Sequence, residues 1–257
     1  MPPWFVLTDP FTLVLLVGAS FAAGLMDSIA GGGGLITVPA LLATGLPPAQ
    51  ALATNKLGSC FGSGTALVRY ARAGMVPRDE VVPAIGFTAV GAVVGTLTVR
   101  FLPTAWLVWL IPLVLAVILV YLLLRPQWGQ EARPARWARL PFYAVFGLAL
   151  GFYDGFLGPG TGTFWTVALT GLLGHGLVRA TAQTKVANFT SNVVSLTVFA
   201  LLGQVLWALG LLMGAFQALG ARLGSRLALT KGTAFIRVIF LVVVGATLAK
   251  LLWTAFG

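Results

Sequence analysis

The chain has 257 residues, of which 58% are hydrophobic and 9% are charged, with a formal net charge of +10. In a soluble domain about a quarter of all residues are charged, so this composition excludes a soluble globular protein. Apolar segments long enough to cross about 30 Å of hydrocarbon recur along the chain, and their continuous pattern excludes a β-barrel. The basic residues lie between these segments, which indicates loops of a membrane protein rather than nucleic-acid binding.

The first part of the chain is predicted to contain a broken helix and three full spans. An apolar segment at 11–26 ends at Asp27, four glycines follow, and a second apolar segment at 35–44 is too short to cross a membrane alone. We therefore expect a helical hairpin or broken helix that turns at residues 31–34. The full spans are expected at 50–70, 81–99 and 105–124.

A polar, basic stretch from Arg125 to Arg139 is the longest hydrophilic interval and is predicted to link two halves. After it we expect segments at 141–157 and 162–173, followed by spans at 181–201, 206–222 and 233–254. The predicted organisation is a first repeat at 1–124, a basic cytoplasmic linker at 125–140 and a second repeat at 141–257.

The second half repeats the motif of the first half. Asp27 and its flanking glycines are matched by Asp154 and its glycines, and further along each half Lys56 is matched by Lys185. The further matched glycines are Gly24 with Gly151, Gly31 with Gly158, Gly33 with Gly160, and the pairs Gly91/Gly95 with Gly220/Gly224. We predict an all-α polytopic membrane protein of two inverted-topology repeats, each with three full transmembrane helices and a broken helix or hairpin at the glycine-rich break.

Loop charges predict the orientation of these repeats. Arginine and lysine gather at 69–78, in the linker, and at 222–231, whereas the loops at 45–49 and 202–206 contain neither. The basic loops are expected in the cytoplasm, which places both termini outside. An odd number of crossings in each half inverts the second half relative to the first, an arrangement common in secondary transporters.

Asp27 and Asp154 are the only acidic residues within the predicted membrane segments. A carboxylate in lipid costs at least about 2.5–3.5 kcal/mol, so it normally faces a partner or a wet cavity. Each aspartate could instead only cap the helix that follows it. The sequence leaves open whether these residues pair with the two lysines or take up a coupling proton.

The glycine-rich breaks are predicted to bind an anion through bare backbone N–H groups at the start of a short helix. The alternative is close packing of helices through small residues. We prefer that alternative for the Gly91/Gly95 and Gly220/Gly224 pairs, which lie mid-span without polar neighbours.

Lys56 and Lys185 each lie about two turns into an apolar segment and are followed by polar side chains on one helical stripe. Such a stripe should line the protein interior or a water path, although a lysine can also snorkel to the interface. The predicted substrate-binding residues are Gly31, Gly32, Gly33, Gly34, Asn55, Lys56, Gly158, Gly160, Thr161, Gly162, Thr184, Lys185, Asn188, Ser191 and Asn192, with Asp27 and Asp154 for coupling or charge pairing. Because His175 and Cys60 are the only residues of their types, no metal site or cofactor is expected.

The run Gly24-x-x-Asp27-Ser28-Ile29-Ala30-Gly31-Gly32-Gly33-Gly34, followed by Asn55-Lys56, resembles the signature of the sulfite exporter TauE/SafE family. The second motif around Asp154, followed by Thr184-Lys185-x-x-Asn188, resembles it as well. The resemblance implies a bacterial or archaeal inner-membrane permease with about eight helices that moves small sulfur-containing anions such as sulfite or organosulfonates.

The leading hypothesis is therefore a secondary transporter, working as an exporter of a small anionic substrate, with proton or ion coupling left open. The alternatives are an anion channel and a permease for another small anion. No nucleophile and base pair points to an enzyme, and a scaffold would leave the buried Asp and Lys pairs without purpose. The partners expected are the lipid bilayer and the anion, with no nucleic acid, and the sequence leaves a homo-oligomer open.

Overall fold

The computed structural model describes residues 9–99, 116, 119–120, 123–124 and 129–256, and these residues form helices and turns without a strand. The predicted span at 105–124 falls almost wholly outside the described residues. Among the described helices, those at Pro10–Ala30, Arg78–Thr98 and Trp207–Ala246 are long and apolar enough to cross a membrane. The chain is thus an all-helical protein with helices able to span a bilayer.

The first broken helix consists of α2 (Pro10–Ala30) and α3 (Gly34–Ala43), as the glycine run predicts. α2 begins after Asp9, whose carboxylate accepts hydrogen bonds from the hydroxyl and the N–H of Thr12. These bonds hold the pKa of the Asp9 carboxyl below its ordinary value. α2 runs beyond the predicted end at residue 26, so that Asp27 lies in its last turn rather than after it.

The second broken helix begins with a continuous run of α7 (Arg139–Phe142), the π-helical turn η1 (Tyr143–Gly147) and α8 (Leu148–Phe156). The break at 157–160 follows, and α9 (Thr161–Leu172) comes after it. Two glycines of this break, at 158 and 160, have φ values of 91° and 85°, which glycine adopts without steric cost. The second predicted break is therefore confirmed.

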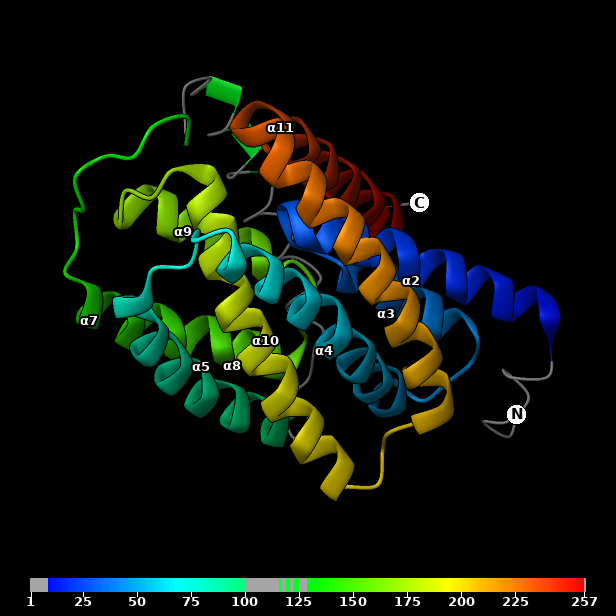
Figure 1. Ribbon diagram of the computed structural model, residues 1–257. Helices are drawn as coiled ribbons and strands as arrows, with labels where there is room; N and C mark the ends of the chain where they lie inside the picture. The colour runs from blue at the N-terminus through cyan, green and yellow to red at the C-terminus, as the bar shows by residue number, and fades with distance from the viewer. Residues whose placement is uncertain (1–8, 100–115, 117–118, 121–122, 125–128, 257) are drawn as a thin grey trace.

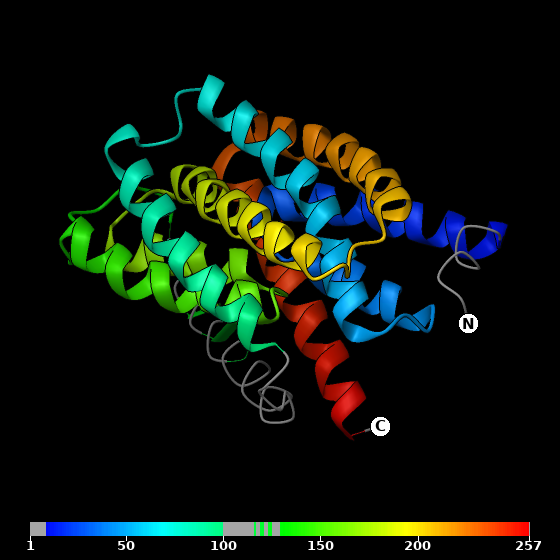
Figure 2. The same ribbon diagram turned by 90° about the horizontal axis from the view of Figure 1, so that it is seen from below.

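Each broken helix is followed by a helix of 25 residues, α4 (Pro48–Arg72) in the first half and α10 (Leu177–Leu201) in the second. The two helices pack antiparallel (Figures 1 and 2). Leu57 of α4 shares a cluster with Phe199 near the end of α10, whereas Tyr70 at the far end of α4 shares one with the start of α10.

The remaining long helices are α5 (Arg78–Thr98) and α11 (Trp207–Phe256). α11 bends at Gly232, where φ is 69° and ψ is −158°. Arg222 and Arg226 therefore lie within the helix, and the prediction of a loop between 222 and 233 is wrong. The leucines and alanines around them sustain the helix, and the glycine alone supplies the break.

Each broken helix packs against a long helix of the other half. α11 lies along α2, and α5 lies along α8 (Figure 1). A Cβ atom added at Gly220 would lie 2.1 Å from the carbonyl oxygen of Phe21, and one at Gly91 would lie 2.4 Å from that of Leu148. These glycines let the helix backbones touch, which confirms the packing role predicted for them.

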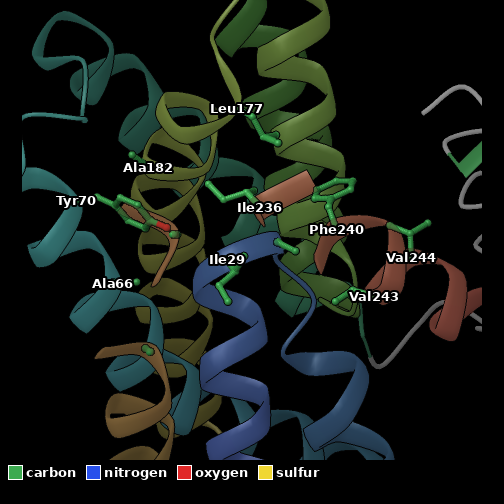
Figure 3. Close-up of a cluster of buried hydrophobic side chains, with 12 residues drawn as sticks. Ile29, Ala66, Tyr70, Leu177, Ala182, Ile236, Phe240, Val243 and Val244 are labelled. Carbon is green, nitrogen blue, oxygen red and sulfur yellow. The ribbon is translucent and has the colours of Figure 1, made fainter. Parts of the chain in front are cut away.

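The largest buried hydrophobic cluster collects side chains from both halves. Figure 3 shows Ile29 at the end of α2, Tyr70 on α4, Leu177 on α10 and Phe240 on the second part of α11 in this cluster. It packs around the C-terminal end of α2, where the first broken helix is interrupted. The end of α2 is therefore held in place by residues that are distant in the sequence.

Candidate functional site

The two glycine-rich breaks lie in direct backbone contact. A Cβ atom added at Gly162 would lie 2.7 Å from Cα of Gly31, and one added at Gly31 would lie 2.5 Å from the carbonyl carbon of Gly162. Gly34 and Pro159 lie beside this contact, at 3.6 Å from an added Cβ to Cα. No side chain fits between the breaks, so the two glycine-rich motifs meet inside the protein.

Four backbone carbonyls at the end of α2 accept hydrogen bonds from other elements. The carbonyls of Asp27, Ser28, Ile29 and Ala30 receive them from Lys185, Tyr70, Thr181 and Thr163, respectively. A helix normally leaves its last four carbonyls without intrahelical partners, and each unsatisfied group costs several kcal/mol in hydrocarbon. Donors from α4, α9 and α10 therefore allow this helix to end inside the protein.

Each buried lysine bonds an aspartate of the other half. Lys56 Nζ on α4 donates to Oδ1 of Asp154 at 2.8 Å and to its carbonyl oxygen at 2.7 Å. Lys185 Nζ on α10 donates to Oδ2 of Asp27 at 3.0 Å and to its carbonyl oxygen. The lysine side chains are 2% and 0% exposed, so neither snorkels to an interface. Each cation also lies at a helix C-terminus, where the helix dipole favours it.

The two aspartates differ in their remaining contacts. Oδ1 of Asp27 accepts a hydrogen bond at 3.3 Å from the N–H of Gly33, the residue that caps the start of α3. Oδ2 of Asp154 instead accepts one from the hydroxyl of Ser191 on α10. Capping and charge pairing therefore coexist at Asp27, whereas Asp154 is held by two side chains of the long helices.

Matching hydrogen bonds hold each short helix on the long helix that follows it. Thr37 of α3 donates to Oδ1 of Asn55, and Thr166 of α9 pairs with the hydroxyl of Thr184 at 3.1 Å. Thr166 and Thr184 stand at the positions of the second half that correspond to Thr37 and Asn55 in the first. The two halves thus share specific side-chain contacts, and Asn55 and Thr184 position the short helices.

A small cavity lies between the two breaks. It offers about 30 Å³ of room for the centres of water molecules, enough for roughly two waters. The lining residues are Asp27, Gly32, Gly33, Gly34, Asn55, Lys56, Ser59, Asp154, Gly158, Thr161, Gly162, Asn188 and Asn192. The predicted residues that do not line it are Gly31, Gly160, Thr184, Lys185 and Ser191, and Ser59 lines it without having been predicted.

The cavity presents hydrogen-bond donors around a site without net formal charge. The two lysines and two aspartates cancel, and among the described residues none accepts a hydrogen bond from the N–H of Gly34 or Gly162. These glycines begin α3 and α9, and helix N-termini of this kind attract anions. One acceptor is buried beside these donors: Oδ1 of Asn188 has no hydrogen-bond partner in the described chain.

A second buried polar cluster, which the sequence motifs did not predict, lies at the start of α5. Glu80, which is 1% exposed, accepts a hydrogen bond at 2.7 Å from the hydroxyl of Tyr143. Nε2 of His175 lies 3.0 Å from the same carboxylate oxygen, and Gln183 donates to the Tyr143 hydroxyl at 2.8 Å. From the sequence, Glu80 lies just before the predicted span at 81–99, and His175 is notable only as the single histidine.

The corresponding positions in the other half are apolar. Leu16, Leu46 and Leu209 stand where the second cluster has Tyr143, His175 and Glu80, and they are buried together. A position-by-position comparison of the two halves would have revealed the polar cluster, because three polar residues of one half correspond to leucines in the other. The two halves therefore differ in polarity at these corresponding positions.

Comparison with protein families gives a match over almost the whole chain. The family model described as "Sulfite exporter TauE/SafE" matches residues 16–251. No solved structure matches the chain.

Curated relatives match over a similar extent. A "Probable membrane transporter protein YfcA" of Escherichia coli strain K12 is 43% identical over 251 residues, which cover 98% of this chain and 93% of that protein. A "Probable membrane transporter protein ORF9" of Sinorhizobium sp is 45% identical over 240 residues, with 93% and 92% covered. A "Probable membrane transporter protein" of Haemophilus influenzae is 40% identical over 241 residues, with 94% of each chain covered.

Proposed function

Because this chain belongs to the sulfite exporter TauE/SafE family of membrane transporters, we propose that it exports small sulfur-containing anions such as sulfite or organosulfonates. The proposed route crosses a bacterial or archaeal inner membrane, with both termini outside. The proposed substrate site is the cavity between the two glycine-rich breaks, near the middle of the membrane.

The observation that carries this proposal is the pairing of each buried lysine with an aspartate of the other half. Lys56 holds Asp154, and Lys185 holds Asp27; Lys56 and both aspartates line the cavity. A sulfonate group or a hydrogensulfite ion has the single negative charge and the acceptor oxygens of a carboxylate, so it can take the place of an aspartate on a lysine. The N–H groups of Gly34 and Gly162 add donors for the remaining oxygens.

Substrate binding then competes with the internal ion pairs. An aspartate displaced by the anion leaves a buried carboxylate without its partner, which is costly unless the carboxyl group takes up a proton. Proton uptake by Asp27 or Asp154 therefore couples naturally to anion binding. The anion on a lysine and the proton on the displaced aspartate can then be carried together, and no buried charge is left unpaired.

Movement between two inverted repeats is the proposed mechanism of alternating access. Its support is the antiparallel packing of α4 with α10 and the exchange of packing partners, α2 with α11 and α8 with α5. The cavity has room for roughly two waters, so a sulfonate needs the two breaks to separate. When the two glycine-rich breaks separate, both Lys–Asp pairs, one on each side of the cavity, are broken and the site opens.

Transport by purified protein in proteoliposomes tests the proposal. Labelled sulfite or sulfoacetate should be taken up with saturable kinetics that depend on a proton or ion gradient, and Lys185→Ala should abolish the uptake. Lys231→Ala removes an exposed lysine of α11 and serves as the matched control with normal uptake. Full activity of folded Lys185→Ala would refute the site, and linear conductance in planar bilayers would indicate a channel instead.

A further inference from the structure

Four arginines line a groove between α4 and α11. Arg69 and Arg72 come from α4, and Arg222 and Arg226 come from the part of α11 before its bend. The groove consists of two adjoining hollows of about 490 and 340 Å³, and both hollows are lined by Arg69 and Arg222. We call it the arginine groove.

The arginine groove lies on the side of α4 away from the substrate cavity. Phe61, Val68 and Arg72 follow one another at helical spacing on one face of α4. Lys56 and Ser59, which line the cavity, lie on the opposite side of the helix. Phe61 and Val68 are 40% and 48% exposed, so in a membrane this face of α4 meets lipid.

The charges of the groove are not neutralised by acidic side chains. Among the described residues, no ion pair involves any of the four arginines. Nε of Arg69 is buried and has no hydrogen-bond partner in the described chain. Because a guanidinium group does not lose its proton in proteins, the cluster keeps its positive charge and can accept an anion from outside the chain.

The internal repeat provides a control for the structural role of these arginines. The positions of the other half that correspond to Arg69, Arg72, Arg222 and Arg226 hold Val198, Leu201, Val93 and Leu97. Apolar side chains thus suffice at the equivalent places on α10 and α5. The shared helix packing therefore does not require arginine at these positions.

We propose that the arginine groove binds an anionic phospholipid of the leaflet on the side where the loop charges place the cytoplasm. Guanidinium groups form bidentate hydrogen bonds to phosphate oxygens, and basic pockets between membrane helices bind anionic headgroups. The acyl chains would lie on the apolar walls formed by Phe61, Val68, Leu219 and Leu223, all exposed. Apolar walls beside the charges favour a lipid over a free anion.

Native mass spectrometry of the delipidated full-length protein tests this proposal with phosphatidylglycerol and phosphatidylcholine as probes. The unmodified protein should retain phosphatidylglycerol in preference to phosphatidylcholine. Arg69→Gln/Arg222→Gln should weaken phosphatidylglycerol binding by roughly thirtyfold, the effect of removing two arginines from an anionic membrane surface. Arg69→Lys/Arg222→Lys keeps the charge and should retain most of the binding.

The matched control is Arg78→Gln/Arg179→Gln, which removes two exposed arginines outside the groove. It should bind phosphatidylglycerol like the unmodified protein. An equal loss in the control would overturn the proposal, as would unchanged binding in the groove variant. Displacement of the lipid by millimolar inorganic phosphate would show that the groove takes a soluble anion, and would also overturn it. Thermal unfolding of each variant identifies any loss caused by misfolding, in which case the Arg→Lys pair decides the outcome.

Discussion

Lys56, on a long helix of the first half, donates hydrogen bonds to both the carboxylate and the backbone carbonyl of Asp154, at the end of a broken helix of the second half. Lys185 makes the same two contacts with Asp27. Each lysine therefore neutralises a buried carboxylate and satisfies the end of a helix that stops inside the protein. The same contacts join the two halves across the candidate site.

The Lys56–Asp154 pair should show the stability pattern of a buried ion pair. Lys56→Met leaves the buried carboxylate of Asp154 without a counter-charge, which should lower the free energy of unfolding by about 3–5 kcal/mol. The double variant Lys56→Met/Asp154→Asn should recover part of this loss, because no unpaired charge remains. Unfolding in detergent micelles measures both values.

The control for this prediction is Asp79→Asn, which breaks an ion pair with Arg139 whose side chains are 52% and 58% exposed. Exposed pairs contribute about 0–1 kcal/mol. If Lys56→Met lowers stability no more than Asp79→Asn, the buried pair does not hold the halves together.

The contact between the two breaks should not tolerate a methyl group. Gly162→Ala places a Cβ atom 2.7 Å from Cα of Gly31, and the resulting overpacking should cost about 1–3 kcal/mol. Transport should fall with it because the breaks can no longer meet. Gly171→Ala, in the same helix with no atom within 4 Å, should be neutral or stabilising by up to about 1 kcal/mol. Equal stability of the two variants would contradict the observed contact.

The cluster around Glu80 should depend on having all of its members. Glu80→Leu alone leaves Tyr143 and His175 buried without their acceptor, a loss of about 1–3 kcal/mol per unsatisfied group. Adding Tyr143→Phe and His175→Leu should restore stability, since the other half packs leucines at all three positions. Chemical denaturation of the single and triple variants measures the difference, and a triple variant less stable than the single one would refute this account.

The sequence contains most of the information needed to place the candidate site. Asp27, Lys56 and their matched partners are rare polar residues in apolar segments, and glycines mark where the helices break. What it could not give is the pairing, since either lysine could have joined either aspartate. The crossed arrangement depends on the antiparallel packing of the long helices, which is a property of the folded chain.

One prediction failed and one cluster was not predicted, each for an identifiable physical reason. Charge alone suggested a loop around Arg222, but the arginines extend to the surface from a helix that continues to Gly232. Glu80 follows Arg78 and Asp79 and looks like part of a charged loop, yet its partners lie on the other half of the chain. The residues next to Glu80 in the sequence therefore do not reveal its partners.

The proposed competition between substrate and aspartate is tested most directly by the anion affinity of Asp27→Asn and Asp154→Asn. Asparagine keeps the size and an acceptor oxygen but does not compete as a charge for Lys185 or Lys56. Sulfite and sulfoacetate should therefore bind each variant roughly tenfold more tightly than the unmodified protein, a gain of about 1.4 kcal/mol, as measured by thermal shift at several ligand concentrations. Unchanged or weaker binding in both variants would contradict the claim that the aspartates occupy the positions the anion takes.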